Sequence, residues 1–228
     1  MSTVIQGSDL KKVYQQGTLE VHALRGVDLT VEAGEFAALV GPSGSGKSTL
    51  LNLVGTLDKP TSGSIQVAGQ EVSGLDRAAS AKFRLKHIGF VFQAYNLLPV
   101  LTAYENAEYT LMLQGVPVSE RKAVVTPLLE RVGLSGMFNR KPHELSGGQQ
   151  QRVAVARALA SKPSLVLADE PTANLDSETG EALLDLMVEL NQHDGVTFVF
   201  ASHDPAVVSR VRRVVTLRDG LVVSDERL

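Results

Sequence analysis

The sequence predicts an α/β fold: a mainly parallel sheet with an antiparallel edge, and an inserted α-helical subdomain. Short β-branched runs bounded by Gly or Pro alternate with helical patterns, which is typical of parallel strands joined by crossover helices. Between Ala94 and Leu159 the strand signal disappears and helical patterns take over. We therefore expect one domain over residues 1–228, with an α/β core at 1–93 and 160–228 and a helical subdomain at 94–159.

The strand predictions rest on apolar runs rich in β-branched residues. The earliest of them, before the first strong helix, are expected to form the antiparallel edge. The predicted strands are Val4–Leu10, Leu24–Val31, Phe36–Val40, Gly63–Val67, Ile88–Phe92, Ser164–Asp169, Thr197–Ala201 and Arg213–Arg218.

The helix predictions rest on apolar residues at helical spacing. A helix with Leu50, Leu53 and Leu57 on one face follows the third strand. Glu120–Val132 shows the same spacing and is closed by Gly133. Further helices are expected at Gln150–Leu159 and Ser177–Asn191.

Composition excludes several classes of function. With 43% hydrophobic and 21% charged residues, the 228-residue chain can bury a sizeable core, and its net charge of −3 disfavours nucleic-acid binding. It contains no cysteine, which excludes disulfides and thiolate metal sites. Its apolar runs are far shorter than the roughly 20 residues of a membrane helix, and its N-terminus lacks a signal-peptide pattern. We expect a cytoplasmic protein without direct membrane insertion, which reaches a membrane only through a partner.

Residues 41–49 read GPSGSGKST and carry the strongest chemical signal. They fit the phosphate-binding pattern G-x-x-x-x-G-K-[ST] and lie between an apolar strand and a helix, the context that this motif requires. Glycines let backbone N–H groups converge on phosphate oxygens, and the helix N-terminus favours negative charge. We expect a P-loop NTPase core in which Lys47 reaches the β- and γ-phosphates and Ser48 ligates Mg²⁺. The predicted nucleotide-binding residues here are Gly41, Pro42, Ser43, Gly44, Ser45, Gly46, Lys47, Ser48 and Thr49.

Two acidic residues, Asp169 and Glu170, end the apolar run Leu165–Ala168. Adjacent side chains on a strand point to opposite sides. Asp169 is therefore expected to face Mg²⁺ through water, and Glu170 to face a water molecule aligned with the γ-phosphate. We predict that Glu170 is the general base, or the group that polarises this water. Two solvated carboxylates at a strand end are the ordinary alternative, which the phosphate loop disfavours.

The segment Leu145–Gln149 reads LSGGQ and precedes a helical run. Ser146 has the position of an N-cap, and the two glycines expose backbone N–H groups at the helix start. On chemistry alone, this is either a second anion-binding helix terminus or a plain helix cap. Nothing in the residues themselves places it beside the phosphate loop.

Between a phosphate loop and an acidic strand end, LSGGQ resembles the signature of the ABC ATPases, and the resemblance covers nearly the whole chain. In that family two subunits pair head to tail, and the signature of one covers the ATP held by the other. The resemblance implies an ATPase that uses ATP and Mg²⁺, in which Ser146, Gly148 and Gln149 complete the active site of a partner copy.

Shorter motifs match the same family. Tyr14 is similar to the aromatic residue that stacks on adenine, the alternative being an ordinary strand tyrosine. Gln93 resembles the glutamine that contacts Mg²⁺, and His203 the switch histidine that contacts the γ-phosphate. Asn174–Asp176 resembles the loop that meets the opposite subunit, and Asp176 also has the position of a helix N-cap. The implied catalytic residues are Lys47, Glu170 and His203, and the implied metal ligands are Ser48, Gln93 and Asp169.

Longer stretches narrow the resemblance. Glu20–Leu29, Val91–Pro99, Leu101–Asn106 and Ala168–Asp176 are similar to the group that includes LolD, MacB and FtsE. Members of this group transmit ATP-driven closure through the membrane to release a lipoprotein, drive an exporter or activate cell-wall enzymes. The resemblance implies a homodimer on the cytoplasmic face of the inner membrane, attached to an integral membrane subunit. The layout, without a membrane segment, is closer to LolD or FtsE, and the sequence leaves open which.

An apolar cluster follows Gln93 and comprises Tyr95, Leu97, Leu98 and Val100. We expect it to form a socket for a cytoplasmic helix of the membrane subunit, because exposed apolar side chains are costly in water. The alternative is that the cluster packs inside the helical subdomain.

Two other classes of function fit less well. ABC ATPases that act on nucleic acid or ribosomes usually carry two cassettes or long coiled-coil insertions, and neither pattern is found. A P-loop kinase or GTPase would leave LSGGQ and His203 unexplained, and the guanine-reading motif N-K-x-D does not occur.

Overall fold

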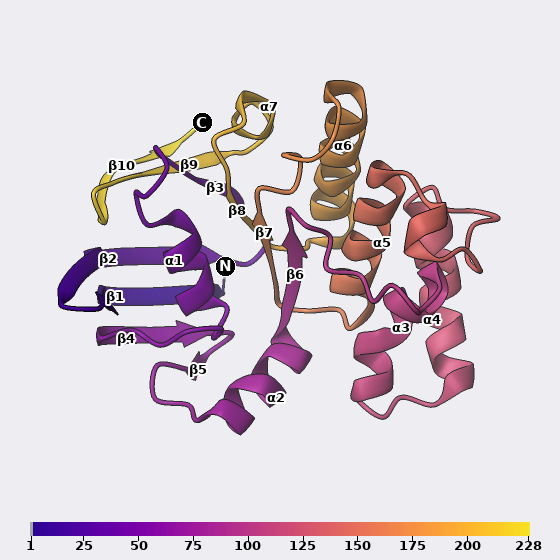
Figure 1. Cartoon of the computed structure of the whole chain (residues 1–228), viewed down its shortest axis with the longest axis horizontal. Coiled ribbons are helices and arrows are strands. Elements are labelled where there is room, and N and C mark those ends of the chain that lie inside the picture. The colour runs from indigo at the N-terminus through magenta and orange to yellow at the C-terminus, as the bar shows by residue number, and fades with distance from the viewer. Residues whose placement is uncertain (1) are drawn as a thin grey trace.

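The apolar runs of the core form a six-stranded sheet in the computed structural model, which describes residues 2–228 (Figure 1). The strand order is β10-β9-β3-β8-β7-β6, and the pairs from β9 to β6 are parallel. β10 runs antiparallel to β9 and forms the antiparallel edge of this sheet. The strands are β3 Phe36–Val40, β6 Ile88–Phe92, β7 Leu165–Asp169, β8 Phe198–Ala201, β9 Arg213–Arg218 and β10 Leu221–Arg227.

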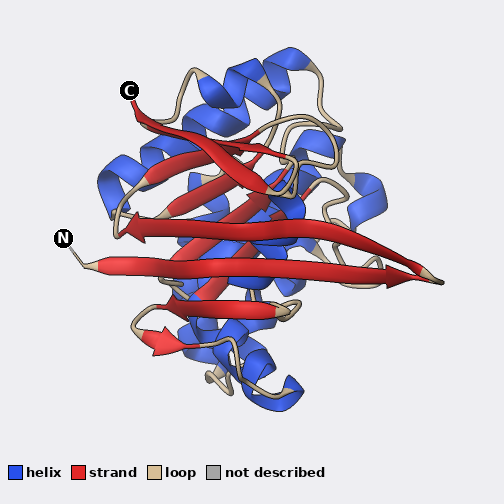
Figure 2. Ribbon diagram, turned by 90° about the vertical axis from the view of Figure 1, so that its left-hand side faces the viewer, coloured by secondary structure: helices blue, strands red, loops and turns tan. Residues whose placement is uncertain are grey.

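Most early strands form a separate sheet with the order β2-β1-β4-β5, in which every pair is antiparallel (Figure 2). The expectation that they provide the edge of the parallel sheet is therefore wrong. Their apolar side chains are buried on one face only, so this sheet covers the core as a layer of its own. These strands are β1 Thr3–Gln16, β2 Leu19–Glu32, β4 Ser62–Val67 and β5 Gln70–Glu71.

Helix α1, Lys47–Val54, lies between the two sheets (Figure 1). Its buried leucines share one apolar cluster with the antiparallel sheet and with Leu39, Leu167 and Val199 of the parallel strands. The alternate residues of those strands, such as Ala38 and Phe200, join a second cluster on the opposite face. Helices α5, Gly147–Ala160, and α6, Ser177–Asp194, contribute to that second cluster. The parallel sheet is thus covered on both faces, which is why its central strands β3, β7 and β8 are almost continuously apolar.

Residues 94–160 contain α3 Ala103–Leu113, α4 Val118–Arg131, the 3₁₀ turn η1 Pro142–Glu144 and α5. This agrees with the helical patterns of the sequence, whereas the division of the chain into a core and a subdomain stays a prediction. Helices α2 Arg77–His87 and α7 Pro205–Val208 were not predicted, and α3 was predicted only as part of the helical region. α2 buries only Ser80 and Phe83, so its sequence lacks a clear apolar face.

Candidate functional site

The phosphate loop connects β3 to α1, as predicted. At two of its glycines, any side chain would collide with neighbouring backbone atoms. A Cβ atom on Gly41 would lie 2.1 Å from the carbonyl oxygen of Leu217, and one on Gly46 would lie 2.7 Å from that of Ala23. Gly46 is the N-cap of α1 and has a φ of 105°, a conformation that favours glycine. The hydroxyl of Ser45 is buried inside the loop and has no hydrogen-bond partner among residues 2–228.

Lys47 is the first residue of α1, and its side chain folds back over the loop. Its ammonium group donates hydrogen bonds to the carbonyl oxygens of Gly41, at 2.8 Å, and Pro42, at 3.2 Å. A positive charge therefore lies at the centre of the loop, where it can meet a phosphate group.

Ser48 and Asp169 come together from different elements. The Ser48 hydroxyl donates to Asp169 Oδ1 at 3.0 Å. Burial raises the pKa of Asp169, and the adjacent charge of Glu170 adds to this, while the bond from Ser48 opposes it. Gln93 lies one residue beyond Phe92, which pairs with Asp169 across β6 and β7. Of the three predicted metal ligands, Ser48 and Asp169 are thus in direct contact, and Gln93 follows the strand that pairs with β7.

Ser48, Asp169 and Gln93 offer oxygen atoms, which are the ligands that Mg²⁺ prefers. Among residues 2–228, no group of three His, Cys, Asp or Glu side chains could enclose a metal ion. A hydroxyl, one carboxylate and an amide oxygen nevertheless fit Mg²⁺ in a nucleotide site, where phosphate oxygens and water supply the other ligands. The unpartnered hydroxyl of Ser45 is a further polar atom inside the phosphate loop.

Glu170 lies just beyond β7 and is held by two residues that follow β8. Its Oε1 lies 2.7 Å from Nδ1 of His203, and its Oε2 accepts a hydrogen bond from the Ser202 hydroxyl at 2.9 Å. The φ of Glu170 is 47°, so the strand geometry assumed in the sequence prediction ends at Asp169. A left-handed backbone, rather than strand alternation, turns Glu170 away from Asp169.

The signature segment begins α5 with a capping box. The Ser146 hydroxyl accepts from the N–H of Gln149 at 3.3 Å, and Gln149 Oε1 accepts from the N–H of Ser146 at 3.0 Å. In the isolated chain, Ser146 therefore caps helix α5, which is one of the two interpretations that the sequence allowed. A Cβ on Gly148 would lie 2.2 Å from Cγ2 of Thr179 in α6, so this glycine also permits close helix packing. Asp176 caps α6 in the same manner, by accepting from the N–H of Thr179 at 2.9 Å.

Tyr14 is partly buried on β1 near the phosphate loop. Its hydroxyl donates to Asp58 Oδ2 at 2.8 Å, and the Lys12 ammonium lies 4.8 Å from the centre of its ring. Burial is the main cause that raises the pKa of Tyr14, and the side chain of Thr49 opposes the shift. These contacts place the ring beside the first turn of α1.

Comparison with known proteins identifies the family. The ABC transporter family matches residues 24–173. The lipoprotein-releasing system ATP-binding protein LolD of Anaeromyxobacter dehalogenans is 49% identical over 97% of this chain and 93% of its own length. The chain belongs to the ABC transporter family.

Other members of the ABC family extend the comparison. The macrolide export ATP-binding/permease protein MacB of Bradyrhizobium diazoefficiens is 49% identical over 96% of this chain, which spans 34% of MacB. The solved structure of the dimeric ATP-binding cassette MJ0796, in a post-hydrolysis state with ADP and Pi, has a TM-score of 0.90 and 43% identity. It covers 98% of both chains. The predicted fold class and resemblance to the LolD and MacB group are confirmed, as is an ATP-binding and ATP-hydrolysing subunit of an ABC transporter.

The loop after β6 is connected to two other parts of this ABC cassette. Gln93 and Asn174 exchange hydrogen bonds: Gln93 Nε2 donates to Asn174 Oδ1 at 3.2 Å, and Asn174 Nδ2 donates to the Gln93 carbonyl at 2.9 Å. Arg157 of α5 donates to the carbonyl oxygens of Tyr95 and Asn96. The predicted metal contact, the loop of Asn174 and the signature helix are therefore linked through one segment.

The apolar cluster after Gln93 divides into buried and exposed parts. Leu97 packs against the helical core, as the alternative interpretation expected. Leu98 is 37% exposed and Val100 is 72% exposed. Buried Asn106 of α3 holds this loop, because its amide bonds to the N–H and C=O of Leu98 and to two further carbonyl oxygens. No helix among residues 2–228 is long and apolar enough to cross a membrane.

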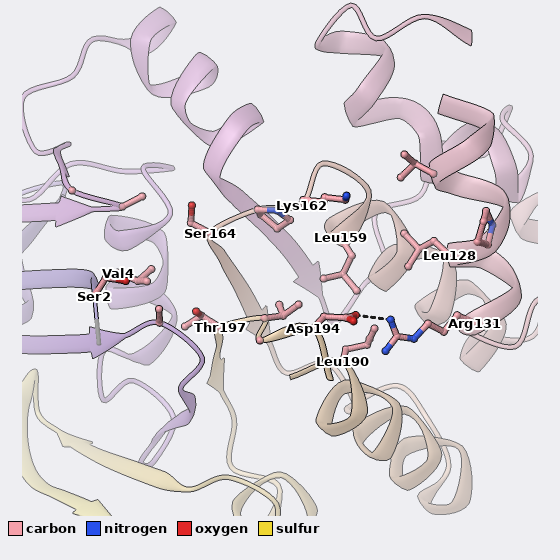
Figure 3. A pocket seen from close by; sticks show the side chains of 18 of the residues that line it. Ser2, Val4, Leu128, Arg131, Leu159, Lys162, Ser164, Leu190, Asp194 and Thr197 are labelled. Carbon is pink, nitrogen blue, oxygen red and sulfur yellow. Dashed lines mark hydrogen bonds and ion pairs between the residues drawn. The ribbon is translucent and has the colours of Figure 1, made fainter. Parts of the chain in front are cut away.

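A cavity of about 1080 Å³ lies at the opposite, amino ends of the parallel strands (Figure 3). Ser164 and Thr197, which precede β7 and β8, line it, and Arg131 of α4 reaches Asp194 of α6 across it. None of the predicted site residues is among its lining residues. In ABC proteins of this fold, as in other open α/β sheets, the ligand is expected at the carboxyl ends of the strands.

Sequence reasoning missed Ser202, although this residue contacts Glu170 directly. The register of the parallel pair explains the contact, since Asp169 lies opposite Ala201 and the next residues emerge side by side. The only available signal was the position of Ser202 immediately after an apolar strand and before His203.

Proposed function

We propose that this chain hydrolyses Mg-ATP at a site completed by a second copy, and thereby drives an integral membrane subunit. The observation that carries the proposal is the convergence of Ser48, Asp169, Glu170 and His203 beside the phosphate loop. A hydroxyl, two carboxylates and an imidazole at one sheet edge supply metal ligands and a general base.

Binding of the nucleotide falls to the phosphate loop and Tyr14. Lys47 exchanges the loop carbonyls for the β- and γ-phosphates, and the N–H groups at the start of α1 bind phosphate oxygens. Ser48, Asp169 and Gln93 would hold Mg²⁺, which would neutralise charge on the phosphate oxygens. The ring of Tyr14 stacks on the adenine base.

Glu170 acts on the attacking water. Its carboxylate accepts a proton from the water as the water oxygen bonds to the γ-phosphorus and the bond to the β-phosphate oxygen breaks. Asp169 turns toward Ser48, which separates the metal ligand from the base. His203 donates to Glu170 through Nδ1, since an ionised carboxylate can only accept. Its Nε2 can donate to the γ-phosphate when the imidazole carries a proton on both nitrogens.

The head-to-tail dimer is supported by the positions of two helices. α1 packs on one face of the parallel sheet and α5 on the other. The signature at the start of α5 thus belongs to a different face from the phosphate loop of its own chain (Figure 1). The similar cassette MJ0796 forms a dimer with ADP and Pi. We infer that Ser146, Gly148 and Gln149 close the site of the partner copy.

Attachment to a membrane subunit on the cytoplasmic face of the inner membrane is supported by the exposed side chains of Leu98 and Val100. They lie on the same segment as Gln93, so a change at the nucleotide can reach the partner. The relatives of this chain include the ATP-binding protein of a lipoprotein-releasing system and an export ATP-binding/permease protein. These relatives favour lipoprotein release or export as the process that the chain drives.

The test uses two variants of the purified chain. Glu170→Gln keeps the shape of the site but removes the base, so ATP binds while kcat falls by about 10²–10⁴-fold. Lys47→Ala removes the charge in the phosphate loop, so nucleotide binding itself is weakened. Titration with a fluorescent ATP analogue and a phosphate-release assay separate the two effects. Turnover by Glu170→Gln at near the wild-type rate contradicts the proposed mechanism.

A further inference from the structure

Ser202 is the most enclosed polar residue at the hydrolytic edge of the site, with 0% of its surface exposed. Its N–H donates to the carbonyl oxygen of Leu39 on β3 at 3.1 Å. Its hydroxyl lies 2.9 Å from Glu170 Oε2 and 3.1 Å from the N–H of Asp204. The backbone and the side chain of this serine are therefore both fixed.

The direction of these hydrogen bonds follows from their donors. The N–H of Asp204 can only donate, so the Ser202 hydroxyl accepts there. Its single proton is then directed to the carboxylate of Glu170, which can only accept when ionised. Asp204 is itself held, because its carboxylate caps α7 and accepts from Thr172 at 2.6 Å. The whole chain of bonds ends on one oxygen of Glu170.

The backbone of Glu170 and the exposure of its other partner explain why its carboxylate needs a buried hydrogen bond. Its φ of 47° lies in the left-handed region, which is unfavourable for a non-glycine residue. Its other hydrogen-bond partner, His203, has a side chain that is 75% exposed and can turn toward a phosphate. A buried and an exposed partner thus bind the two oxygens of one carboxylate.

We propose that Ser202 is a positioning residue for Glu170: its buried hydroxyl fixes the carboxylate toward the attacking water and leaves His203 free to contact the γ-phosphate. This inference rests on the proposed role of Glu170 as the base. Ser202 touches neither the nucleotide nor the water, and it acts only through Glu170.

The experiment compares three variants of the full chain in a steady-state Mg-ATPase assay. Ser202→Ala removes the bond, and Ser202→Thr retains a hydroxyl. Thr197→Val is the matched control, since Thr197 is also buried beside β8 and accepts a backbone hydrogen bond, from the N–H of Gly34 at 3.0 Å. It lies at the other end of the strand, far from Glu170 in the register.

A hydrogen bond to a charged group is lost in Ser202→Ala, so kcat should fall about tenfold or more. The KM and the affinity for a fluorescent ATP analogue should stay within about twofold, because Ser202 makes no contact with the bound nucleotide. Ser202→Thr should recover most of the rate, and Thr197→Val should turn over normally even if its melting temperature falls. If Ser202→Thr does not fold, the comparison of Ser202→Ala with Thr197→Val decides.

A double variant separates this inference from the proposed function. Groups that act as one unit are not additive, so Ser202→Ala should cause no further loss in a Glu170→Gln background. The inference is overturned if Ser202→Ala keeps its rate, if Thr197→Val loses as much, or if the double variant loses more than Glu170→Gln. If Ser202→Ala keeps its rate while Glu170→Gln loses activity, only the role of Ser202 fails. Normal turnover by Glu170→Gln would show that Glu170 is not the base, and Ser202 would then have no base to position.

Discussion

His203 Nδ1 lies 2.7 Å from Glu170 Oε1, although the two residues are separated by 33 positions in the sequence. The parallel register of β7 and β8 brings them together at the carboxyl edge of the sheet. The Glu170 side chain is 19% exposed, so this pair has one fixed and one accessible member. Such an arrangement holds the carboxylate while the imidazole remains available to a ligand.

We predict that His203→Ala lowers kcat by about 10²-fold or more without preventing ATP binding. The substitution removes a donor to the base and the proposed contact with the γ-phosphate, both of which act on the chemical step. Phosphate release and binding of a fluorescent ATP analogue are the measurements. His193→Ala is the control, because His193 is exposed in the last turn of α6. An equal loss in both variants contradicts a specific role for His203.

Tyr14→Ala should raise the KM for ATP and leave kcat nearly unchanged. Stacking of a base on an aromatic ring is worth about 1–3 kcal/mol, which corresponds to a roughly 5- to 150-fold change in affinity. Tyr14→Phe keeps the ring but loses the bond to Asp58, so its KM should change less. Initial rates at varied ATP concentration provide the test, and equal KM values for wild type and Tyr14→Ala would exclude stacking at this position.

The exposed part of the loop after Gln93 should be needed for coupling and not for folding. We expect Leu98→Ser with Val100→Ser to leave basal ATPase and the melting temperature unchanged, because both side chains are exposed. Binding to the membrane subunit, and its effect on ATPase, should be lost together. Leu97→Ala is the contrasting variant, and it should lower the melting temperature because Leu97 packs on the core. Normal coupling in the double variant would place the contact elsewhere.

Asn106 should be a scaffold residue whose loss is felt in stability. Its buried amide makes four hydrogen bonds to the backbone of residues 98–102, so Asn106→Ala should cost about 2–4 kcal/mol of unfolding free energy. Gln114→Ala, which removes one bond from an exposed side chain to Leu85, should cost about 1 kcal/mol or less. Denaturant titration of both variants measures the difference. Equal losses would show that the amide of Asn106 is not the scaffold.

The sequence predicted the parallel strands closely. β3, β6 and β9 have the predicted bounds, and β7 and β8 each begin one residue later. β3, β7 and β8 are buried on both faces, so their apolar runs are almost continuous and sharply bounded. β10 was missed because its exposed, alternating residues lack such a run. The separate antiparallel sheet was missed because its β1–β4 pair joins strands that are not consecutive, and no local pattern shows that these strands pair with each other and not with the core sheet.

The site was predicted in composition but not in geometry. The motif of the phosphate loop placed Lys47 and Ser48 correctly on α1, and the strand end placed Asp169 near Ser48. The left-handed backbone of Glu170 and the support from Ser202 depend on strand register, which a single sequence does not show. The roles of these residues in catalysis stay predictions.

Two copies of the chain are proposed to complete one active site, and a crosslink between them tests this directly. Ser43 in the phosphate loop and Ser146 at the start of α5 are both exposed, and the chain contains no native cysteine. One copy carries Ser43→Cys and the other Ser146→Cys, both in the Glu170→Gln background, and the mixture is oxidised with and without ATP. A disulfide requires Cα atoms within about 7 Å. A shared site predicts a covalent dimer only from the mixture and only with ATP, whereas dimer from either variant alone, or without regard to ATP, contradicts a shared site.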